Sequence, residues 1–378
     1  MTTARIGAHI KPTRDACLCG ALRMDIPMKL SDLGFDPWFE AHAAACGLDG
    51  CGFARISAVD RGAYLIRTGD REIPAVLSGK LAHQITQPAD LPCVGDWATA
   101  HTYNDGAAAL IHKVFPRKTF LRRKAPGEAH AFQMIAANID IAFLVQSCHF
   151  DFNPRRLDRY LVMAADGHVE PVIVLTKTDL ITQHALEQKL SIIRAITAAR
   201  VIALSGVTGI GCEAFRQTLT PGRTYCLLGS SGVGKTTLVN RLMGREAFAA
   251  RAVSGTGEGT HTTTRRQLIV LGQGAMLIDT PGMRELGVAG ADEGISTGFE
   301  DIGRLAENCR FVDCSHGREP GCAVRAAIEA GALDAARYAN YVKLKKESEY
   351  YAMSSLEKRE PHKSFGRFIK SVKKGLKR

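Results

Sequence analysis

The chain has 378 residues, enough for two or three domains, and its formal charge of +11 favours an anionic partner such as nucleic acid. No apolar run approaches the ~18 to 20 residues of a membrane span, and residues 1–30 lack the apolar core of a signal peptide. We therefore expect neither a membrane protein nor a secreted one, but a soluble cytoplasmic protein.

Short strand-like segments follow an N-terminal extension over residues 1–33. They are divided by Gly- and Asp-containing turns and cover residues 52–59, 63–67, 73–77 and 92–100. Such a run of short strands and turns predicts a small β-barrel. Barrels of this kind often bind oligonucleotides on one face, and a purely structural adaptor barrel is the alternative.

Two basic segments favour RNA as the anionic partner. Residues 112–124 interleave cations with aromatic side chains, and residues 358–378 are rich in Lys and Arg, with Glu360 as their one acid. Polybasic segments neutralise phosphates and release counterions, which gives salt-sensitive affinity without sequence preference. A solvated end is compatible with this role, whereas a basic amphipathic helix containing Phe365 and Phe368 would favour a membrane surface instead.

Residues 176–179, Thr-Lys-Thr-Asp, follow an apolar strand-like run at residues 171–175. Asp179 in this position can accept hydrogen bonds from N1–H and the exocyclic amine of guanine, a pair of donors that adenine does not present. Lys177 would lie along the base plane. Thr176 stands where Asn is usual, which would weaken one bracing contact. The pattern predicts GTP rather than ATP.

Residues 229–236, Gly-Ser-Ser-Gly-Val-Gly-Lys-Thr, fit the G-x-x-x-x-G-K-[ST] phosphate-loop pattern. An apolar strand-like run precedes them, and an amphipathic helix starts after them at residues 237–243. Backbone N–H groups in such a loop curl around phosphate oxygens, aided by the helix dipole. Lys235 would reach the outer phosphates, and Thr236 would offer its hydroxyl to Mg²⁺. A chance Gly/Ser turn is the alternative, which the flanking strand and helix disfavour.

Asp279 ends another apolar run and is followed by Thr-Pro-Gly. In this position it would hold Mg²⁺, usually through a water, while the N–H of Gly282 faces the γ-phosphate; a turn aspartate before Pro-Gly is the alternative. In the Thr-rich segment upstream, Thr262 or Thr263 would complete the Mg²⁺ coordination when the γ-phosphate is present. The sequence does not choose between the two threonines, and a solvated polar loop is the alternative.

The order of these motifs is their most informative property. An ordinary GTPase begins with the phosphate loop and ends with the guanine-reading Lys-x-Asp, whereas here residues 176–179 precede residues 229–236. Another strand-like run also precedes the phosphate loop and ends in a small-residue loop at residues 205–206. The backbone N–H groups of that loop would cover the guanine carbonyl. The same parts in rotated order predict a circularly permuted GTPase. The residues assigned to the nucleotide are Thr176, Lys177, Thr178, Asp179, Ser205, Gly206, Gly229, Ser230, Ser231, Gly232, Val233, Gly234, Lys235, Thr236, Thr237 and Gly282.

Three of the eleven cysteines gather with one histidine near the C-terminus. Three thiolates and an imidazole within 14 residues are the ligand set of a closed tetrahedral zinc site, and a reducing cytosol favours a metal over a disulfide. A coincidental cluster is the alternative. Cys17 and Cys19, and the pair Cys46 and Cys51, lack comparable partners and stay unassigned. The four expected zinc ligands are Cys309, Cys314, His316 and Cys322.

These features together resemble the ribosome small-subunit-dependent GTPase A family, whose members are circularly permuted GTPases. The likeness runs from about residue 35 to about residue 351. It rests on the rotated motif order, the Cys/His set, residues 59–81 and the Val-Gly-Asp-Trp sequence at residues 94–97. It implies an N-terminal OB-type β-barrel, a circularly permuted α/β P-loop GTPase and a C-terminal helical zinc-binding module. The implied boundaries are residues 34–105, 106–297 and 298–350, followed by a basic tail over residues 351–378.

The resemblance also implies a function. Members of the family bind the small ribosomal subunit and its rRNA, assist its late maturation, and hydrolyse GTP to GDP and phosphate with turnover that the subunit stimulates. We accordingly expect one structural Zn²⁺, Mg²⁺ with GTP, and a monomer that works without a membrane. Two other classes stay open. One is a zinc-containing RNA-binding protein with a slow or vestigial nucleotide site, and the other is a metabolic P-loop kinase or ATPase, which would lack the guanine reader.

The catalytic assignment comes from the same resemblance. Ordinary GTPases place Gln after the Asp-x-x-Gly motif to orient water, but Met283 stands there and cannot polarise a water. The resemblance implies a histidine of the switch segment instead, here His261, acting beside Lys235; a solvated loop histidine is the alternative. A mechanism using K⁺ needs Asn in the phosphate loop, where this chain has Gly232. Thr260 also departs from the family pattern, because an arginine often precedes the histidine.

Overall fold

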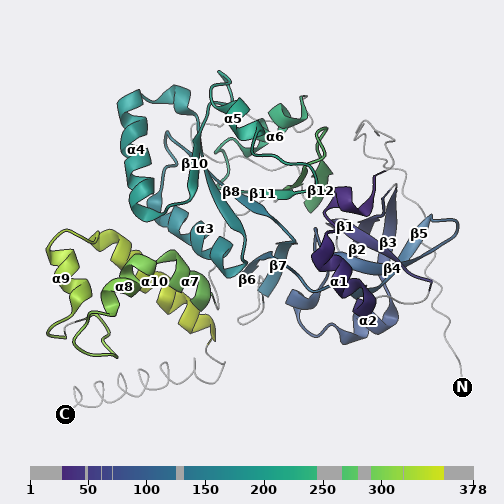
Figure 1. The fold of residues 1–378 in the computed structure, drawn as a ribbon, viewed down its shortest axis with the longest axis horizontal. Coiled ribbons are helices and arrows are strands. Elements are labelled where there is room, and N and C mark those ends of the chain that lie inside the picture. The colour runs from purple at the N-terminus through teal and green to yellow at the C-terminus, as the bar shows by residue number, and fades with distance from the viewer. Residues whose placement is uncertain are drawn as a thin grey trace, which may run out of the picture.

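The computed structural model describes residues 28–46, 50–60, 62–69, 71–124, 132–244, 266–279, 291–317 and 319–352. Within these residues the chain forms a β-barrel, a central sheet covered by helices, and a C-terminal group of helices (Figure 1). The predicted three-part architecture is therefore confirmed. No helix in the described ranges is both long and apolar enough to cross a membrane.

Five strands form the barrel, and β1 closes it by pairing with both β2 and β4. β2 pairs with β3, β3 pairs in parallel with β5, and β5 returns antiparallel to β4. This five-stranded path is of the OB type, as the resemblance implied. The strands are β1 (Gly52–Asp60), β2 (Ala63–Arg67), β3 (Glu72–Leu77), β4 (Trp97–Tyr103) and β5 (Ala108–Val114).

The second half of the barrel differs from the prediction in two ways. The strand expected over residues 92–100 begins only at Trp97, because Cys93 and Asp96 close a turn: the Cys93 N–H donates to the Asp96 carboxylate at 2.8 Å. In addition, β5 continues into the segment that was predicted from its charges to bind RNA. Ala109 and Ile111 of β5 are buried, so strand pairing extends the barrel to residue 114.

Short helices cover the entry to the barrel and the connection between β3 and β4. Phe35 packs edge-on against Trp97, with ring centroids 4.7 Å apart, and stacks on Phe53 at 5.5 Å. This aromatic cluster ties the entry segment to the barrel core. The helices are η1 (Leu30–Leu33), α1 (Pro37–Cys46), α2 (Gly79–Gln84) and η2 (Pro88–Asp90).

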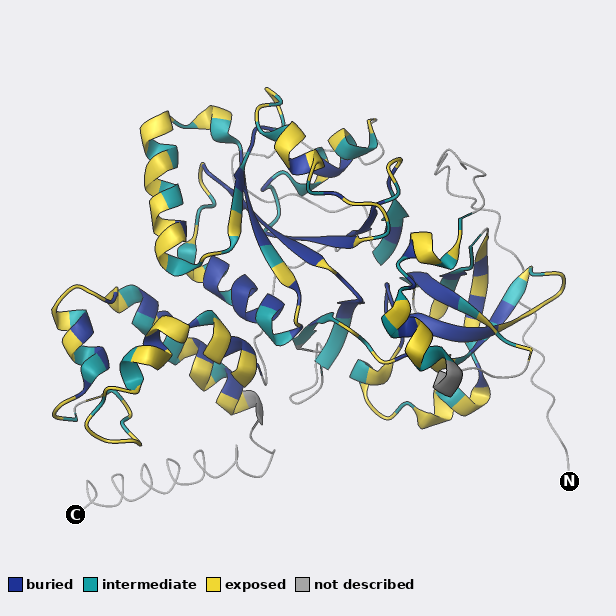
Figure 2. Cartoon of the chain, viewed as in Figure 1, coloured by how far each residue is buried: buried dark blue, intermediate teal, exposed yellow. Residues whose placement is uncertain are grey.

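The central sheet has the strand order β10-β9-β8-β11-β13-β12. Neighbours from β10 to β13 are parallel, and β12 is antiparallel to β13. β8 and β11 are buried along their whole length, as expected for parallel strands with both faces covered (Figure 2). The strands are β8 (Ile141–Ser147), β9 (Glu170–Thr176), β10 (Arg200–Ala203), β11 (Thr224–Leu228), β12 (Arg266–Val270) and β13 (Met276–Asp279).

Helices accompany these strands, and a separate hairpin lies between the barrel and the central sheet in the chain. The hairpin consists of β6 (Phe120–Lys124) and β7 (Phe132–Ala137). The helices of the central domain are α3 (Pro154–Asp166), η3 (Thr178–Leu180), α4 (Gln183–Ile196), α5 (Cys212–Arg216) and α6 (Lys235–Met243).

The position of β11 explains the permutation. This strand leads into the phosphate loop and lies between β8 and β13. β8, β9 and β10 precede it in the chain and lie on one side of it, whereas β12 and β13 follow it and lie on the other. The chain therefore enters the domain halfway through the usual order, which confirms the circular permutation inferred from the motifs.

The barrel and the central sheet are joined through one strand pair. β1 runs antiparallel to β12, with Val59 opposite Arg266. Arg55 of β1 is fully buried near this junction and donates to three backbone carbonyls from separate segments. Burial lowers the pKa of Arg55 to about 10, so the guanidinium is still charged at neutral pH. Its acceptors are the carbonyl oxygens of Leu33, Gly95 and Asn138.

The C-terminal helices pack against α3 of the central domain (Figure 1). Arg337 of α10 donates to Asp158 of α3 at 2.7 Å and to Asp301 of α8 at 2.8 Å. Asn340 donates to the other oxygen of Asp158 at 2.8 Å. A buried polar network therefore joins the helical module to the central domain. Its helices are α7 (Asp292–Gly298), α8 (Glu300–Ala306), α9 (Ala323–Glu329) and α10 (Ala335–Ala352).

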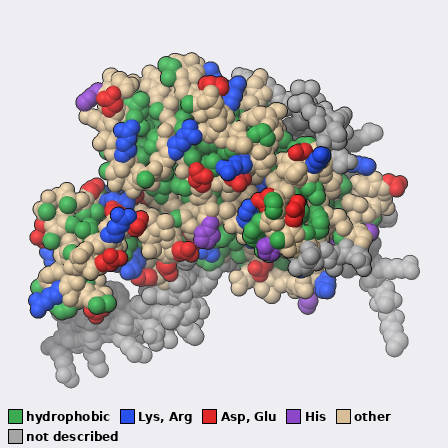
Figure 3. All heavy atoms as spheres, viewed as in Figure 1, with side chains coloured by type: hydrophobic (Ala, Val, Ile, Leu, Met, Phe, Trp, Pro, Cys, Tyr) green, Lys and Arg blue, Asp and Glu red, His purple; other side chains and the backbone are tan. Residues whose placement is uncertain are grey.

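The basic segment at residues 112–124 is largely engaged within the protein. Arg117 pairs with the buried Asp96 at 2.9 Å, and Arg122 pairs with Asp166 at 2.8 Å. On the face shown in Figure 3, Lys and Arg side chains are scattered among acids rather than gathered in one patch. The two arginines therefore brace the barrel and α3 rather than form a free basic face.

Candidate functional site

The predicted nucleotide motifs meet at one edge of the central sheet. β9 ends at Thr176, β11 ends at Leu228 and β13 ends at Asp279, and these strands run in the same direction. Their carboxyl ends therefore share an edge, which is where open α/β sheets bind their ligands. Residues 229–234 follow β11 directly and lead into α6.

Two glycines make the phosphate loop possible. A Cβ on Gly229 would lie 2.5 Å from the carbonyl oxygen of Val145 in β8, so only glycine allows this close approach. Gly234 has a φ of +100° and immediately precedes α6, a backbone region that favours glycine. The Lys235 ammonium donates to the carbonyl oxygens of Gly229 and Ser230, both at 2.6 Å. A cation and a helix N-terminus thus converge on the loop, an arrangement that suits phosphate.

Thr176 braces the phosphate loop from the neighbouring strand end. Its hydroxyl lies 2.5 Å from the carbonyl oxygen of Val233 and 3.2 Å from that of Gln146, and the residue is buried. We expected that Thr in place of Asn would weaken this contact. The short hydroxyl–carbonyl distance shows that threonine reaches the loop in spite of its smaller side chain.

The base-reading residues are held in a fixed arrangement. Ser205 donates its hydroxyl to the Asp179 carboxylate at 2.5 Å and accepts from the N–H groups of Val207 and Thr208. Lys177 adopts a left-handed conformation with a φ of 58°. Ser205 therefore holds one carboxylate oxygen of Asp179 in place, which prepares the side chain to accept hydrogen bonds from a base.

The loop after β10 touches the phosphate-loop helix. A Cβ on Gly206 would lie 2.9 Å from Cγ2 of Thr237, so glycine is needed where the two segments meet. Arg241 of α6 donates to the carbonyl oxygen of Gly206. The base side and the phosphate side of the site are therefore in direct contact.

The predicted Mg²⁺ and catalytic residues are only partly described. Thr236 lies in the first turn of α6, beside Lys235, and Asp279 is the last residue of β13. The other predicted residues of this group, His261, Thr262, Thr263 and Gly282, lie outside the described residues.

One contact to the phosphate loop was missed by sequence reasoning. Arg156, in the first turn of α3, pairs with Asp151 at 2.8 Å and contacts the hydroxyl of Ser230. Arg156 and Ser230 are 74 residues apart, and no motif contains both. Only the positions of α3 and β11 in the folded chain reveal it.

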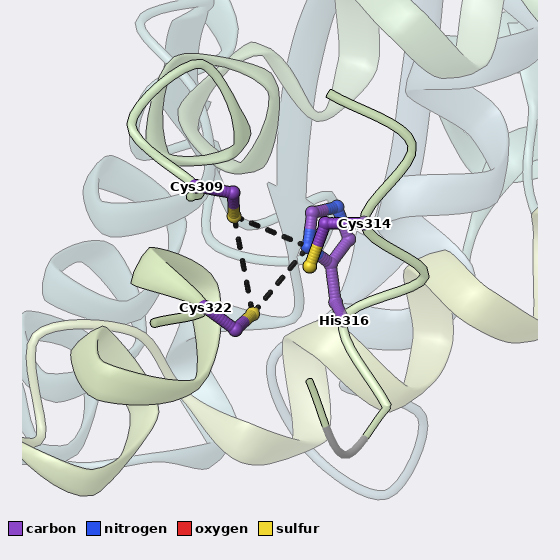
Figure 4. Close-up of side chains that lie close together, drawn as sticks. All are labelled: Cys309, Cys314, His316 and Cys322. Atoms are coloured by element: carbon purple, nitrogen blue, oxygen red, sulfur yellow. Dashed lines mark hydrogen bonds between the residues drawn. The ribbon is translucent and has the colours of Figure 1, made fainter. Parts of the chain in front are cut away.

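The predicted metal ligands come together in the helical module (Figure 4). Their ligand atoms all lie within 4.8 Å of one another. Sγ of Cys309 lies 3.9 Å from Sγ of Cys322, and Nδ1 of His316 lies 3.5 Å from both. A tetrahedral zinc with ordinary bond lengths requires S–S separations of ~3.8 Å and S–N separations of ~3.6 Å. The residues present therefore fit a metal ion of this kind.

The pKa values of the cluster are shifted in different directions by its close packing. Burial raises the pKa of the Cys309 thiol, but backbone hydrogen bonds at Val324 and Ala323 outweigh it and leave that pKa below its usual value. Desolvation raises the pKa of Cys314 to about 11, with the Cys309 charge adding to it, and lowers the pKa of His316. Thiols this close repel one another when ionised, and a divalent cation removes that repulsion.

Comparisons with known proteins agree with this geometry. A model of the RsgA GTPase family matches residues 114–289. The "Small ribosomal subunit biogenesis GTPase RsgA" of Opitutus terrae is 42% identical over 335 residues, which cover 86% of this chain and 91% of that protein. The crystal structure of YjeQ from Thermotoga maritima matches with a TM-score of 0.59 at 26% identity, covering 79% of this chain and 98% of the other.

A second solved structure supports the fold alone. YloQ, described as a circularly permuted GTPase, matches with a TM-score of 0.55 at 24% identity and covers 80% of this chain and 96% of its own. The resemblance inferred from the motif order and the ligand cluster is confirmed. The chain belongs to the RsgA GTPase family.

Proposed function

We propose that this chain binds GTP and hydrolyses it to GDP and phosphate when it docks on the small ribosomal subunit during subunit maturation. The observation that carries the proposal is that the base-reading residues and the phosphate loop form one site. Thr176 bonds to the phosphate loop, and Ser205 orients Asp179. The relative from Opitutus terrae, whose name states small ribosomal subunit biogenesis, supports the choice of partner. On this proposal the protein works as a monomer in the cytoplasm.

The proposed roles divide between the two ends of the site. Asp179 accepts hydrogen bonds from guanine, Lys177 lies along the base, and Ser205 holds the carboxylate in place. The loop from Gly229 to Thr237 surrounds the phosphates with N–H groups, and Lys235 neutralises their charge. Gly206, Thr178 and Gly282 complete the set proposed from the sequence.

Mg²⁺ would be held near the first turn of α6. Thr236 there supplies a hydroxyl, Asp279 at the end of β13 supplies a carboxylate, and Thr262 or Thr263 supplies a further oxygen. When bound, the ion would neutralise charge that develops on the phosphates. We propose that His261 orients the attacking water, because Met283 stands at the position where Gln usually does this.

We propose that the metal in the helical module is one structural Zn²⁺. Three sulfur ligands and one imidazole at tetrahedral spacing favour zinc over Mg²⁺ or Ca²⁺, which prefer oxygen. The module would then present a rigid surface to rRNA. The basic tail over residues 351–378 would add salt-sensitive contacts to the same RNA.

The zinc assignment predicts one equivalent of zinc per purified chain. The Cys322→Ser variant should lose the metal and melt several degrees lower, because binding free energy at such sites contributes to folding. Cys322 also accepts the Arg325 N–H at the start of α9, and serine keeps that capping role. The lower melting temperature would therefore reflect the loss of the metal rather than the loss of the cap of α9. Cys51→Ser, at a cysteine outside the cluster, should keep its zinc. Full metal content in the Cys322 variant would contradict the assignment.

Hydrolysis of GTP with and without small ribosomal subunits tests the proposed function. We expect subunits to raise GTP turnover at least ~10-fold, a modest value for docking-stimulated GTPases, with no corresponding turnover of ATP. The Lys235→Ala variant should lose ~100-fold or more of this activity, as expected when a donor to developing charge is removed. Equal rates with and without subunits would exclude stimulation. Turnover by the lysine variant equal to wild type would overturn the site.

A further inference from the structure

A cavity of about 680 Å³ lies where the helical module meets the outer side of the phosphate loop. Its walls come from three parts of the chain: the start of α3, one face of α10, and Ser230 and Ser231 of the phosphate loop. The cavity therefore touches both the element expected to hold phosphates and the module expected to bind RNA.

The described lining of this cavity contains four cations and no carboxylate. Arg156 is paired with Asp151, and Arg159 is paired with Glu347. Two cations remain at the rim, Arg155 on α3 and Lys343 on α10, both exposed. Among the residues that the structure describes, neither side chain has an ion pair or hydrogen bond.

Both paired arginines connect the cavity to other parts of the molecule. Arg159 bonds to both oxygens of Glu347 at 2.8 Å, which fixes α3 against α10 and so sets the width of the cavity. Arg156 is shared between Asp151 and the hydroxyl of Ser230. An anion entering the cavity would compete for Arg156 and so alter its contact with the phosphate loop.

We infer that this cavity binds a backbone phosphate of RNA through Arg155 and Lys343, and that its occupation is passed to the phosphate loop by Arg156 acting on Ser230. The two exposed cations belong to different modules, so a ligand that reaches both approaches from outside, as an RNA strand does. Exposed Arg and Lys are the usual partners of nucleic-acid phosphates. The inference rests on the proposed function, because the RNA would be that of the docked subunit.

A double variant, Arg155→Ala with Lys343→Ala, tests this inference. Its matched control is Arg194→Ala with Lys345→Ala, which removes the same two charges from α4 and from the opposite side of α10. GTP turnover is measured with and without small subunits, and binding of a mixed-sequence single-stranded RNA is measured over a range of salt. Basal turnover of the cavity variant should equal wild type. The subunit concentration for half-maximal stimulation should rise about 10-fold, and the salt slope of RNA binding should fall by about 1 to 2.

The control should behave as wild type in both assays. Equal behaviour of the two double variants would overturn the inference, since total charge rather than the cavity would then be responsible. Binding of inorganic pyrophosphate is measured for the same variants. Its loss from the cavity variant with unchanged RNA binding would also overturn the inference, by assigning the cavity to a small anion. If the wild-type protein is not stimulated by subunits, the proposed function fails. The RNA salt slope then still tests the cavity by itself.

Discussion

Replacing Asp179 by Asn is expected to reverse the base preference of the nucleotide site. The carboxylate accepts two hydrogen bonds from guanine, whereas the amide of Asn offers one acceptor and one donor group. Its donor would face the exocyclic amine of guanine, which leaves both donor groups unpaired with each other. We expect GDP affinity to fall ~100-fold or more, since sites built around such bonds discriminate strongly against a mismatched partner.

The same substitution should improve binding of xanthine nucleotides. Xanthine carries a carbonyl where guanine carries the exocyclic amine, and the side-chain amide introduced by Asp179→Asn can donate to it. Displacement of a fluorescent nucleotide by GDP and by xanthosine diphosphate measures both affinities. Glu213→Gln, an equivalent change on the nearby α5, should leave both unchanged. An equal loss for the two nucleotides would mean that Asp179 supports the fold of the site rather than reads the base.

The parts of the site that sequence predicted are those with fixed local spacing. The phosphate loop is a single run of eight residues, and the four metal ligands lie within 14 residues. In each case chain connectivity alone keeps the groups close together. Residues that are this close in the sequence are also expected to be close in space. The structure places the four ligand atoms at the spacing that a tetrahedrally coordinated ion needs.

Contacts that join distant segments were not predicted. Thr176 bonds to Val233 from 57 residues away, and Arg337 bonds to Asp158 from 179 residues away. The residues around Thr176 in the sequence do not reveal whether its hydroxyl reaches the phosphate loop or whether threonine is a weaker substitute for Asn there. That distinction depends on how closely β9 and β11 are placed by β8, which lies between them.

Strand β5 was missed for a different physical reason. From residue 109 to residue 112 the strand alternates between the buried Ala109 and Ile111 and the half-buried Leu110 and His112, and the exposed Lys113 then breaks the alternation. Together with the arginines that follow, the basic side chains of His112 and Lys113 indicated a nucleic-acid-binding segment. Alternation over so short a run is a weak signal beside a cluster of charges. Pairing with β3 and β4 decides the structure.

Replacing Arg337 by Ala is expected to loosen the helical module from the central domain. Arg337 has a side chain 9% exposed, and its partner Asp158 is 4% exposed. Removing one member of a buried pair leaves the other charge without compensation, at a cost of about 3 to 5 kcal/mol. Arg304→Ala is the matched control in the same module, because its pair with Glu300 is 70% and 67% exposed. Such surface pairs contribute little to the free energy of unfolding, because solvent screens the two charges.

Denaturant unfolding followed by circular dichroism compares the free energies of unfolding of the Arg337→Ala and Arg304→Ala variants. Hydrogen exchange shows which helices lose stability. Faster exchange in α3 and α10 is expected for Arg337→Ala alone, since these helices meet through Asp158 and Asn340. Asp158→Asn should cost less than Arg337→Ala. Desolvation raises the pKa of Asp158, so its charge is already disfavoured by burial, and Asn keeps an oxygen to accept the Arg337 bond. Equal stability of the two arginine variants would show that the module is held by apolar packing alone, and that the network around Asp158 serves only to orient α10.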